Sequence, residues 1–292
     1  MYFERLDKKK TASNYICAFK HFKRFRGDQD IAIEDLTVGQ MKDFQSYLIG
    51  EGLRMNTISL YNRELRAVYN YALDEEIIQM DKRPFRKSFT GQEKTRKRAV
   101  DGGVVKRLAI LSLIDKEMLG FARDLFLFSI YMQGMPFIDM AYLKKEQVRN
   151  GCITYQRRKT NRQLRVKIHP QAQIIIDRYM VSDPGCPYLF PILYDPEKKT
   201  EWEYSSALRV YNKRLDSLSS LLELDEPLTS YVARHTWASL ARQCGTSDTV
   251  ISEAMGHSHV GVTTIYLASL DIGMVAMANQ RVITSLFRKR IP

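Results

Sequence analysis

The last quarter of the chain contains three short segments, YVARHT at residues 231–236, MGH at residues 255–257 and VTTIY at residues 262–266. Arg234, in the first segment, carries a planar guanidinium that can bind two phosphate oxygens at once. His257 can support the same phosphate, and the hydroxyl of Tyr266 can attack it. An arginine, a histidine and a tyrosine in this order predict that the protein cuts a phosphodiester with its own side chain.

The expected nucleophile, Tyr266, needs help from its surroundings. A phenol has a pKa of about 10, so ionising it at pH 7 costs roughly 4 kcal/mol, and arginines on the scissile phosphate lower that cost. The attack conserves the bond energy in a phosphotyrosine, so we expect no cofactor. The order of the three residues carries the prediction, because the chain has 16 tyrosines and any one of them alone would be weak evidence.

A β-hairpin with a polar tip is predicted between residues 152 and 168. Residues 152–155 and 164–168 alternate in polarity, and Lys159 lies in the polar stretch between them. The 5′ oxygen that leaves during cleavage needs a proton, and a lysine on a mobile hairpin can supply it. The hairpin is basic along its length, which is equally consistent with a solvated strand face.

A metal site is not expected. The segment His257-Ser258-His259 has no Cys, Asp or Glu beside it at ligand spacing. The four cysteines are scattered without a C-x-x-C pair, which argues against a zinc knuckle or a redox motif. A metal-dependent nuclease would need clustered carboxylates, and the sequence has none.

The pattern of apolar residues indicates a mainly α (α+β) protein of two domains. Apolar and aromatic side chains recur at helical spacing within residues 1–81, which predicts a small helical bundle. Residues 101–292 contain a continuous apolar run at 125–131, best explained as a buried helix, followed by the hairpin. Further helices are expected at 172–180, at 205–222, from a Thr229/Ser230 cap through 240, and from a cap at 245–248 through 255.

Residues 82–100 are predicted to be a basic linker. Residues 82–98 hold eight basic residues against Glu93 alone, a net +7 of the +12 on the chain. A block of this kind is a polyanion contact or a solvated tail, and its polarity predicts a place on a surface or on nucleic acid. With no apolar run near the roughly 20 residues of a membrane span and no signal peptide, we expect a cytoplasmic protein.

Taken together, these segments resemble the tyrosine recombinase (phage integrase) family over most of the chain, in a style similar to Bacteroides-type integrases. Residues 228–238 are similar to its H-x-x-R box, and residues 255–258 to its L-G-H-S box. Tyr266 follows His257 by nine residues, as the family requires, and Lys159-Thr160 resembles its hairpin lysine motif.

The resemblance implies an N-terminal helical core-binding (SAM-like) bundle and a C-terminal mixed α/β catalytic domain that clamp double-stranded DNA. It implies a protein that is monomeric in solution and a homotetramer on paired sites, with accessory DNA-bending proteins. Strand exchange would pass through a Holliday junction, and the apolar segment after Tyr266 would dock on a neighbouring protomer or on its own domain. The residues expected to contact DNA are Arg83, Arg86, Lys87, Lys94, Arg96, Lys97, Arg98, Arg158 and Arg162.

Two positions depart from the family pattern. Tyr231 stands where the family has histidine, and a tyrosine can still donate one hydrogen bond. The first arginine of the family falls at Pro136 or, in another form of the box, at Gln133. Losing that contact would cost roughly 2–4 kcal/mol of transition-state stabilisation. Either Arg123 or an arginine of the hairpin replaces it, or catalysis is slow; Asp139 keeps the acidic place of the box.

The leading hypothesis is a site-specific recombinase, an integrase or invertase, that forms a 3′-phosphotyrosyl intermediate. One alternative is a catalytically weakened DNA-binding accessory paralogue, and another is a type IB topoisomerase. The chain starts almost directly at the helical bundle, without an arm-binding domain, which favours a simple inversion or resolution system or a truncated protein.

Overall fold

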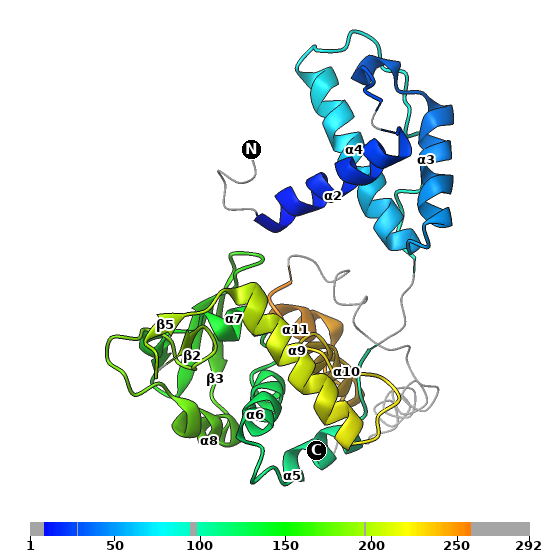
Figure 1. Ribbon diagram of the computed structural model, residues 1–292. Coiled ribbons are helices and arrows are strands. Elements are labelled where there is room, and N and C mark those ends of the chain that lie inside the picture. Colours follow the sequence, from blue (N-terminus) through cyan, green and yellow to red (C-terminus); the bar gives the residue numbers. More distant parts are fainter. Residues whose placement is uncertain (1–8, 28, 94–97, 196, 258–292) are drawn as a thin grey trace, which may run out of the picture. The chain divides into compact units, whose positions relative to one another are not determined.

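The computed structural model describes residues 9–27, 29–93, 98–195 and 197–257, and the chain divides into two units between Arg96 and Lys97 (Figure 1). The N-terminal unit consists of α2 (Lys9–Phe25), the 3₁₀ turn η1 (Ile33–Asp35), α3 (Val38–Gly50) and α4 (Met55–Asp74). In α3, Thr37 and Gln40 form a reciprocal capping box. The apolar faces of the three helices meet in one core around Met41, Phe44 and Leu48, so the predicted helical bundle is confirmed.

The first half of the predicted linker is packed against this bundle. Phe85 is buried, with its ring 6.1 Å from that of Tyr69. Asn62 donates to the carbonyl of Phe89, and Ser59 donates to that of Gly91. The expectation that the segment is too polar to bury is therefore wrong for Phe85, because side chains of α4 supply the hydrogen bonds that its backbone needs.

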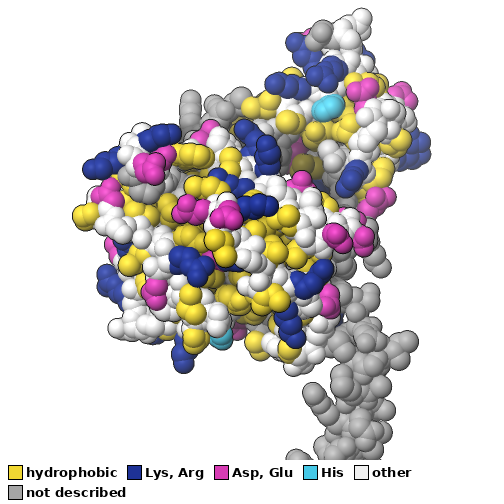
Figure 2. Space-filling model, turned by 60° about the horizontal axis from the view of Figure 1, so that its bottom comes forward, with side chains coloured by type: hydrophobic (Ala, Val, Ile, Leu, Met, Phe, Trp, Pro, Cys, Tyr) yellow, Lys and Arg dark blue, Asp and Glu magenta, His cyan; other side chains and the backbone are white. Residues whose placement is uncertain are grey.

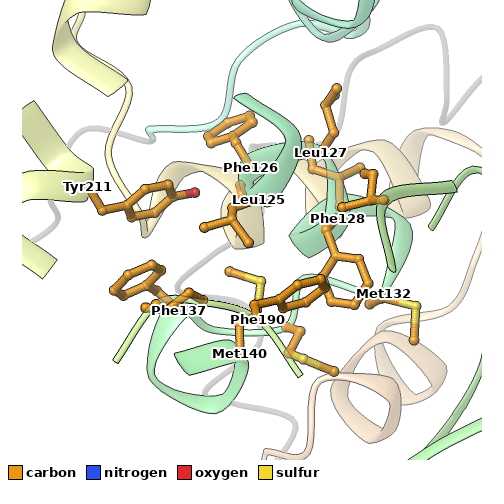
Figure 3. Close-up of a cluster of buried hydrophobic side chains, with 14 of the residues drawn as sticks. Leu125, Phe126, Leu127, Phe128, Met132, Phe137, Met140, Phe190 and Tyr211 are labelled. Atoms are coloured by element: carbon orange, nitrogen blue, oxygen red, sulfur yellow. The ribbon is translucent and has the colours of Figure 1, made fainter. Parts of the chain in front are cut away.

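The C-terminal unit is built around α6 (Glu117–Tyr131), which packs against α5, α8, α9 and α10. The helices of this unit are α5 (Gly102–Ile110), α6, α7 (Phe137–Ala141), α8 (Pro170–Tyr179), α9 (Tyr204–Leu221), α10 (Val232–Gln243) and α11 (Asp248–Ala254), with a 3₁₀ turn η2 (Lys145–Gln147). The apolar run predicted as a buried helix lies in α6, and Figure 3 shows its side chains in the core. There Phe137 stacks on Tyr211 of α9 at 4.3 Å, and Phe128 meets Phe190 edge-on.

A three-stranded antiparallel sheet contains the predicted hairpin. Its strands are β1 (Val148–Arg149), β2 (Cys152–Gln156) and β3 (Gln163–Lys167), and a second small hairpin pairs β4 (Tyr194–Asp195) with β5 (Thr200–Glu201). The register pairs Ile153 with Val166 and Tyr155 with Leu164, and these four side chains are buried. Because side chains alternate across a strand, the polar neighbours face outward.

The two short turns that precede α10 and α11 differ in how they cap their helices. Ser247 caps α11 through its hydroxyl, as expected from the sequence. The predicted Thr229/Ser230 cap of α10 is wrong, because Tyr231 occupies the N-cap position and makes no capping hydrogen bond. Within the described residues, no helix combines the length and apolar character needed to cross a membrane.

Candidate active site

Arg234 is the largest fully buried side chain of the described residues, with 2% of its surface exposed. It projects from the first turn of α10 and donates to the carbonyls of Gly134 at 2.8 Å and Met255 at 2.6 Å. Its second terminal nitrogen also lies 3.0 Å from Nε2 of His257. A buried charge is costly unless it is hydrogen-bonded, so these contacts hold the guanidinium in one place.

The turn at residues 133–136, where the first arginine of the family would lie, contributes backbone instead of charge. Gln133 and Gly134 both have left-handed backbone, with φ of +60° and +70°. A Cβ at Gly134 would lie 3.1 Å from the Cα of Arg234, so any other residue would have to push back the backbone of α10 as well as adopt left-handed backbone. Pro136 is the N-cap of α7. The turn therefore offers the Gly134 carbonyl to Arg234 and no basic side chain.

A second buried arginine, Arg157, bonds to the same Met255 carbonyl as Arg234. Its terminal nitrogen donates to the Met255 carbonyl at 2.9 Å and to the Gly256 carbonyl at 3.1 Å. Arg157 and Arg234 thus share the oxygen of Met255 as an acceptor. Only 5% of the surface of Arg157 is exposed, whereas its sequence neighbour Arg158 is exposed.

The sequence analysis raised a hairpin arginine as a replacement but did not single out Arg157. The sequence does contain a signal for the burial of Arg157, because Arg157 continues the alternation by which Ile153 and Tyr155 face the core. The other candidate, Arg123, has different partners: its Nε lies 2.7 Å from Asp124, and it donates to the Leu111 carbonyl. The structure therefore brings Arg157, and not Arg123, to Arg234.

Asp139, on α7, is the carboxylate of this cluster. Its Oδ2 lies 3.7 Å from Nε of Arg157, and its Oδ1 accepts the backbone N–H of Arg158 at 3.0 Å. Burial raises the pKa of Asp139, while the Arg158 N–H and the charges of Arg157 and Arg234 oppose that rise. Among the residues that the structure describes, Asp139 is the carboxylate that lies beside the two buried guanidiniums, and two guanidiniums so close together suit the binding of an anion.

His257 lies directly after the left-handed turn at Gly256 and is buried. Burial, and then the charges of Arg234, Arg157 and Lys159, lower the pKa of His257 to about 3. A guanidinium has only donors, so Nε2 of His257 accepts from Arg234 and the ring proton resides on Nδ1. The imidazole is therefore neutral at physiological pH.

The remaining predicted site residues lie at the edge of this cluster or outside the described residues. Lys159 is exposed on the hairpin tip, and its charge contributes to the low pKa of His257. Tyr231 is 43% exposed, with its ring edge-on to His235 at 4.7 Å. Tyr266 lies outside the described residues.

Among the residues expected to contact DNA, Arg158 places its guanidinium 3.8 Å from the centre of the Tyr142 ring. Arg162 bonds to the turn at His257. The described basic residues of the linker, Arg83, Arg86, Lys87 and Arg98, are exposed, whereas Lys94, Arg96 and Lys97 lie outside the described residues.

Comparison with known proteins identifies the family. A model of the phage integrase SAM-like domain matches residues 2–89, and a model of the phage integrase family matches residues 107–271. The chain belongs to the phage integrase family. This membership confirms the resemblance seen in the sequence, and it supports a DNA-cleaving and rejoining site-specific tyrosine recombinase over the topoisomerase and accessory-factor alternatives.

Solved structures show the same two-domain fold. A lambda integrase dimer bound to a COC′ core site is similar with a TM-score of 0.69 at 15% identity, over 93% of this chain and 96% of that one. The Tn1549 transposon integrase in complex with transposon right end DNA gives a TM-score of 0.72 at 13% identity, over 92% and 94%. A search of curated proteins found no match. The mostly helical integrase fold expected from the sequence is thus confirmed.

Proposed function

We propose that this integrase cleaves and rejoins double-stranded DNA at a specific site through a 3′-phosphotyrosyl intermediate on Tyr266, and that Arg157 supplies the second arginine. The observation that carries the proposal is the pair of buried guanidiniums that meet at the Met255 carbonyl, with the carboxylate of Asp139 beside Arg157. Preorganised donors in a water-poor site stabilise developing phosphate charge strongly. A phosphate oxygen would compete for the donors that the carbonyls now occupy.

The reaction would be a transesterification in each direction. The Tyr266 hydroxyl gives up its proton to solvent and its oxygen forms a bond to phosphorus. The bond from phosphorus to the 5′ oxygen breaks, and the ammonium of Lys159 gives its proton to that oxygen and is left as a neutral amine, which solvent reprotonates. Arg234 and Arg157 neutralise the phosphate, and neutral His257 keeps Arg234 oriented through Nε2. Religation reverses these steps, so no cofactor and no metal ion is needed.

The partner would be duplex DNA, bound in part by the exposed linker residues Arg83, Arg86, Lys87 and Arg98 and by Arg158 on the hairpin. Basic side chains are scattered with acidic ones over the face seen in Figure 2. A lambda integrase tetramer bound to a Holliday junction is a structural neighbour at 16% identity with a TM-score of 0.69. By analogy, we propose a monomer that assembles into a tetramer on paired sites in the bacterial cytoplasm, with DNA-bending proteins as accessory factors.

The test is covalent trapping. The protein is incubated in EDTA with nicked suicide substrates made from the DNA that flanks its own gene, and adducts are resolved on denaturing gels. We expect a tyrosine-linked adduct with wild type and none with Tyr266→Phe. Tight, salt-dependent binding without an adduct would instead show a DNA-binding factor, and in that case recovery of cleavage by Gln133→Arg would show that the first arginine is missing.

A further inference from the structure

The tip of the β2–β3 hairpin is attached by side chains to the turn that carries His257. Thr160 Oγ1 donates to the Gly256 carbonyl at 3.2 Å, and Arg162 donates to the His257 carbonyl at 3.2 Å. A second nitrogen of Arg162 lies 3.5 Å from the carboxylate of Glu253 on α11. Together with Arg157, three of the six residues from Arg157 to Arg162 bond to residues 253–257.

The tip is also a compact unit in itself. The N–H of Arg157 donates to the Arg162 carbonyl at 2.8 Å, and the N–H of Asn161 donates to the Arg157 carbonyl at 2.7 Å. Asn161 has left-handed backbone with φ of +57°, which closes the turn. Because these bonds tie the two ends of the tip together, it docks on the His257 turn as one body.

Lys159 lies inside this docked unit but outside its contacts. Arg157 precedes it and Thr160 and Arg162 follow it, while Lys159 itself is exposed. Because Arg157 and Thr160, which flank Lys159 in the sequence, both donate to the Gly256 carbonyl, the backbone of Lys159 is held beside the His257 turn. The docked tip therefore sets the place of Lys159 relative to the phosphate-binding cluster.

We propose that Thr160 and Arg162 are positioning residues that latch the hairpin tip onto the Gly256–His257 turn and so place Lys159 to protonate the leaving oxygen. This inference rests on the proposed function. It also changes the expected role of Arg162, whose guanidinium bonds to protein in this state rather than being free for DNA. The latch acts on one step only, the transfer of the Lys159 proton to the 5′ oxygen.

The leaving group distinguishes this role from a general structural one. Suicide substrates are prepared with either an ordinary 5′ oxygen or a bridging 5′ sulfur at the scissile phosphate. A thiol ionises near pH 8.5, so a thiolate leaves without a proton, and any residue that acts only through the general acid loses its importance. Cleavage rates are measured on both substrates for Lys159→Ala, Arg162→Gln, Thr160→Val and the matched control Arg165→Gln on the exposed face of β3.

On the oxygen substrate, we expect Lys159→Ala to slow cleavage by about 10²–10⁴-fold, the range of general acid catalysis. Arg162→Gln and Thr160→Val should each slow it by roughly tenfold, a part of the same contribution. On the sulfur substrate, all three should approach the wild-type rate, and Arg165→Gln should match wild type on both. In a Lys159→Ala background, Arg162→Gln should add less than about twofold, because coupled residues are not additive.

Equal slowing of Arg162→Gln on both substrates, or an undiminished effect in the Lys159→Ala background, would overturn the latch. Arg157→Ala serves as the contrast, since a phosphate-binding residue is needed with either leaving group. If wild type cleaves neither substrate, the proposed function fails. If wild type cleaves and only Lys159→Ala is rescued by sulfur, the function stands and the latch alone fails.

Discussion

The turn at residues 133–136 (the first wall) and the hairpin end at Arg157 (the second wall) both join the hydrogen-bond network of Arg234, and we propose that they have exchanged roles relative to the family pattern. The first wall, where the family has an arginine, holds Gln133 and Pro136 and offers the Gly134 carbonyl. The second wall brings a buried arginine to the Met255 carbonyl. The difference teaches that a buried arginine can reach the hydrogen-bond network of Arg234 from a different part of the chain than the family pattern predicts, and we propose that Arg157 makes the phosphate contact that the first wall lacks.

The largest effect is expected from removing the Arg157 side chain of the second wall. Arg157→Ala should lower the cleavage rate by about 10²–10³-fold, as for the loss of one preorganised donor, while Gln133→Ala should leave the rate within about threefold. The rates of adduct formation on the suicide substrate measure both. Arg157→Lys keeps a charge beside Asp139 and controls for loss of folding. Equal effects of Arg157→Ala and Gln133→Ala would contradict the exchange of roles.

The second prediction compares Gly134 of the first wall with Gly256, whose carbonyl accepts from Arg157 of the second wall. Alanine at Gly134 or at Gly256 must adopt left-handed backbone, which costs about 1–2 kcal/mol. At Gly134 the new Cβ also meets the backbone of Arg234, whereas at Gly256 it meets the Leu164 and Arg157 side chains, which can shift. Urea unfolding should show a greater loss of stability for Gly134→Ala. A greater loss of stability for Gly256→Ala would mean that the backbone around Gly134 adjusts to a Cβ more easily than the side chains around Gly256 do.

The third prediction concerns the pH dependence of stability that burial, and then the two arginines, impose through His257. Its folded pKa of about 3 lies below the unfolded value near 6.5. The unfolded state alone binds a proton between these values, so stability falls as pH falls from 6.5 toward 3. The penalty is at most about 2 kcal/mol at pH 5.

This pH effect is measured as the difference between wild type and His257→Asn in urea unfolding at pH 5 and pH 8. The variant should lose less stability at pH 5 than wild type. The comparison is needed because burial raises the pKa of Asp139, which gives a trend of the opposite sign. Identical pH dependence of the two proteins would show that His257 is not held neutral by its neighbours.

The smallest effect is expected from restoring an arginine to the first wall. Gln133→Arg in the otherwise wild-type protein should change the cleavage rate by less than about threefold, because Arg157 already supplies the charge and a third guanidinium adds repulsion. A gain of 100-fold or more would show that Arg157 does not occupy the functional place.

Much of the fold could be predicted from local pattern. Helical spacing of aromatic residues located α2, α3 and α4, and alternation located β2 and β3, because both periodicities follow from short-range backbone geometry. Packing of Phe85 on the bundle could not be predicted, since it depends on hydrogen bonds between the linker and side chains such as Asn62 and Ser59 on α4. The predicted cap of α10 was wrong for a similar reason. Thr229 and Ser230 can cap a helix only if the fold places one of them at the N-cap position, and Tyr231 occupies that position.

The sequence by itself determined the family, the order of Arg234, His257 and Tyr266, and the absence of an arginine at residues 133–136. Only the tertiary structure decided which residue stands beside Arg234. Arg157 and Arg123 are equally basic in the sequence, but strand alternation turns Arg157 inward to the end of α11, while α6 directs Arg123 to Asp124 and the Leu111 carbonyl. Arg157 and Arg234 are 77 residues apart in the sequence. They come together because the elements that carry them pack against one another, and no local sequence pattern encodes that packing.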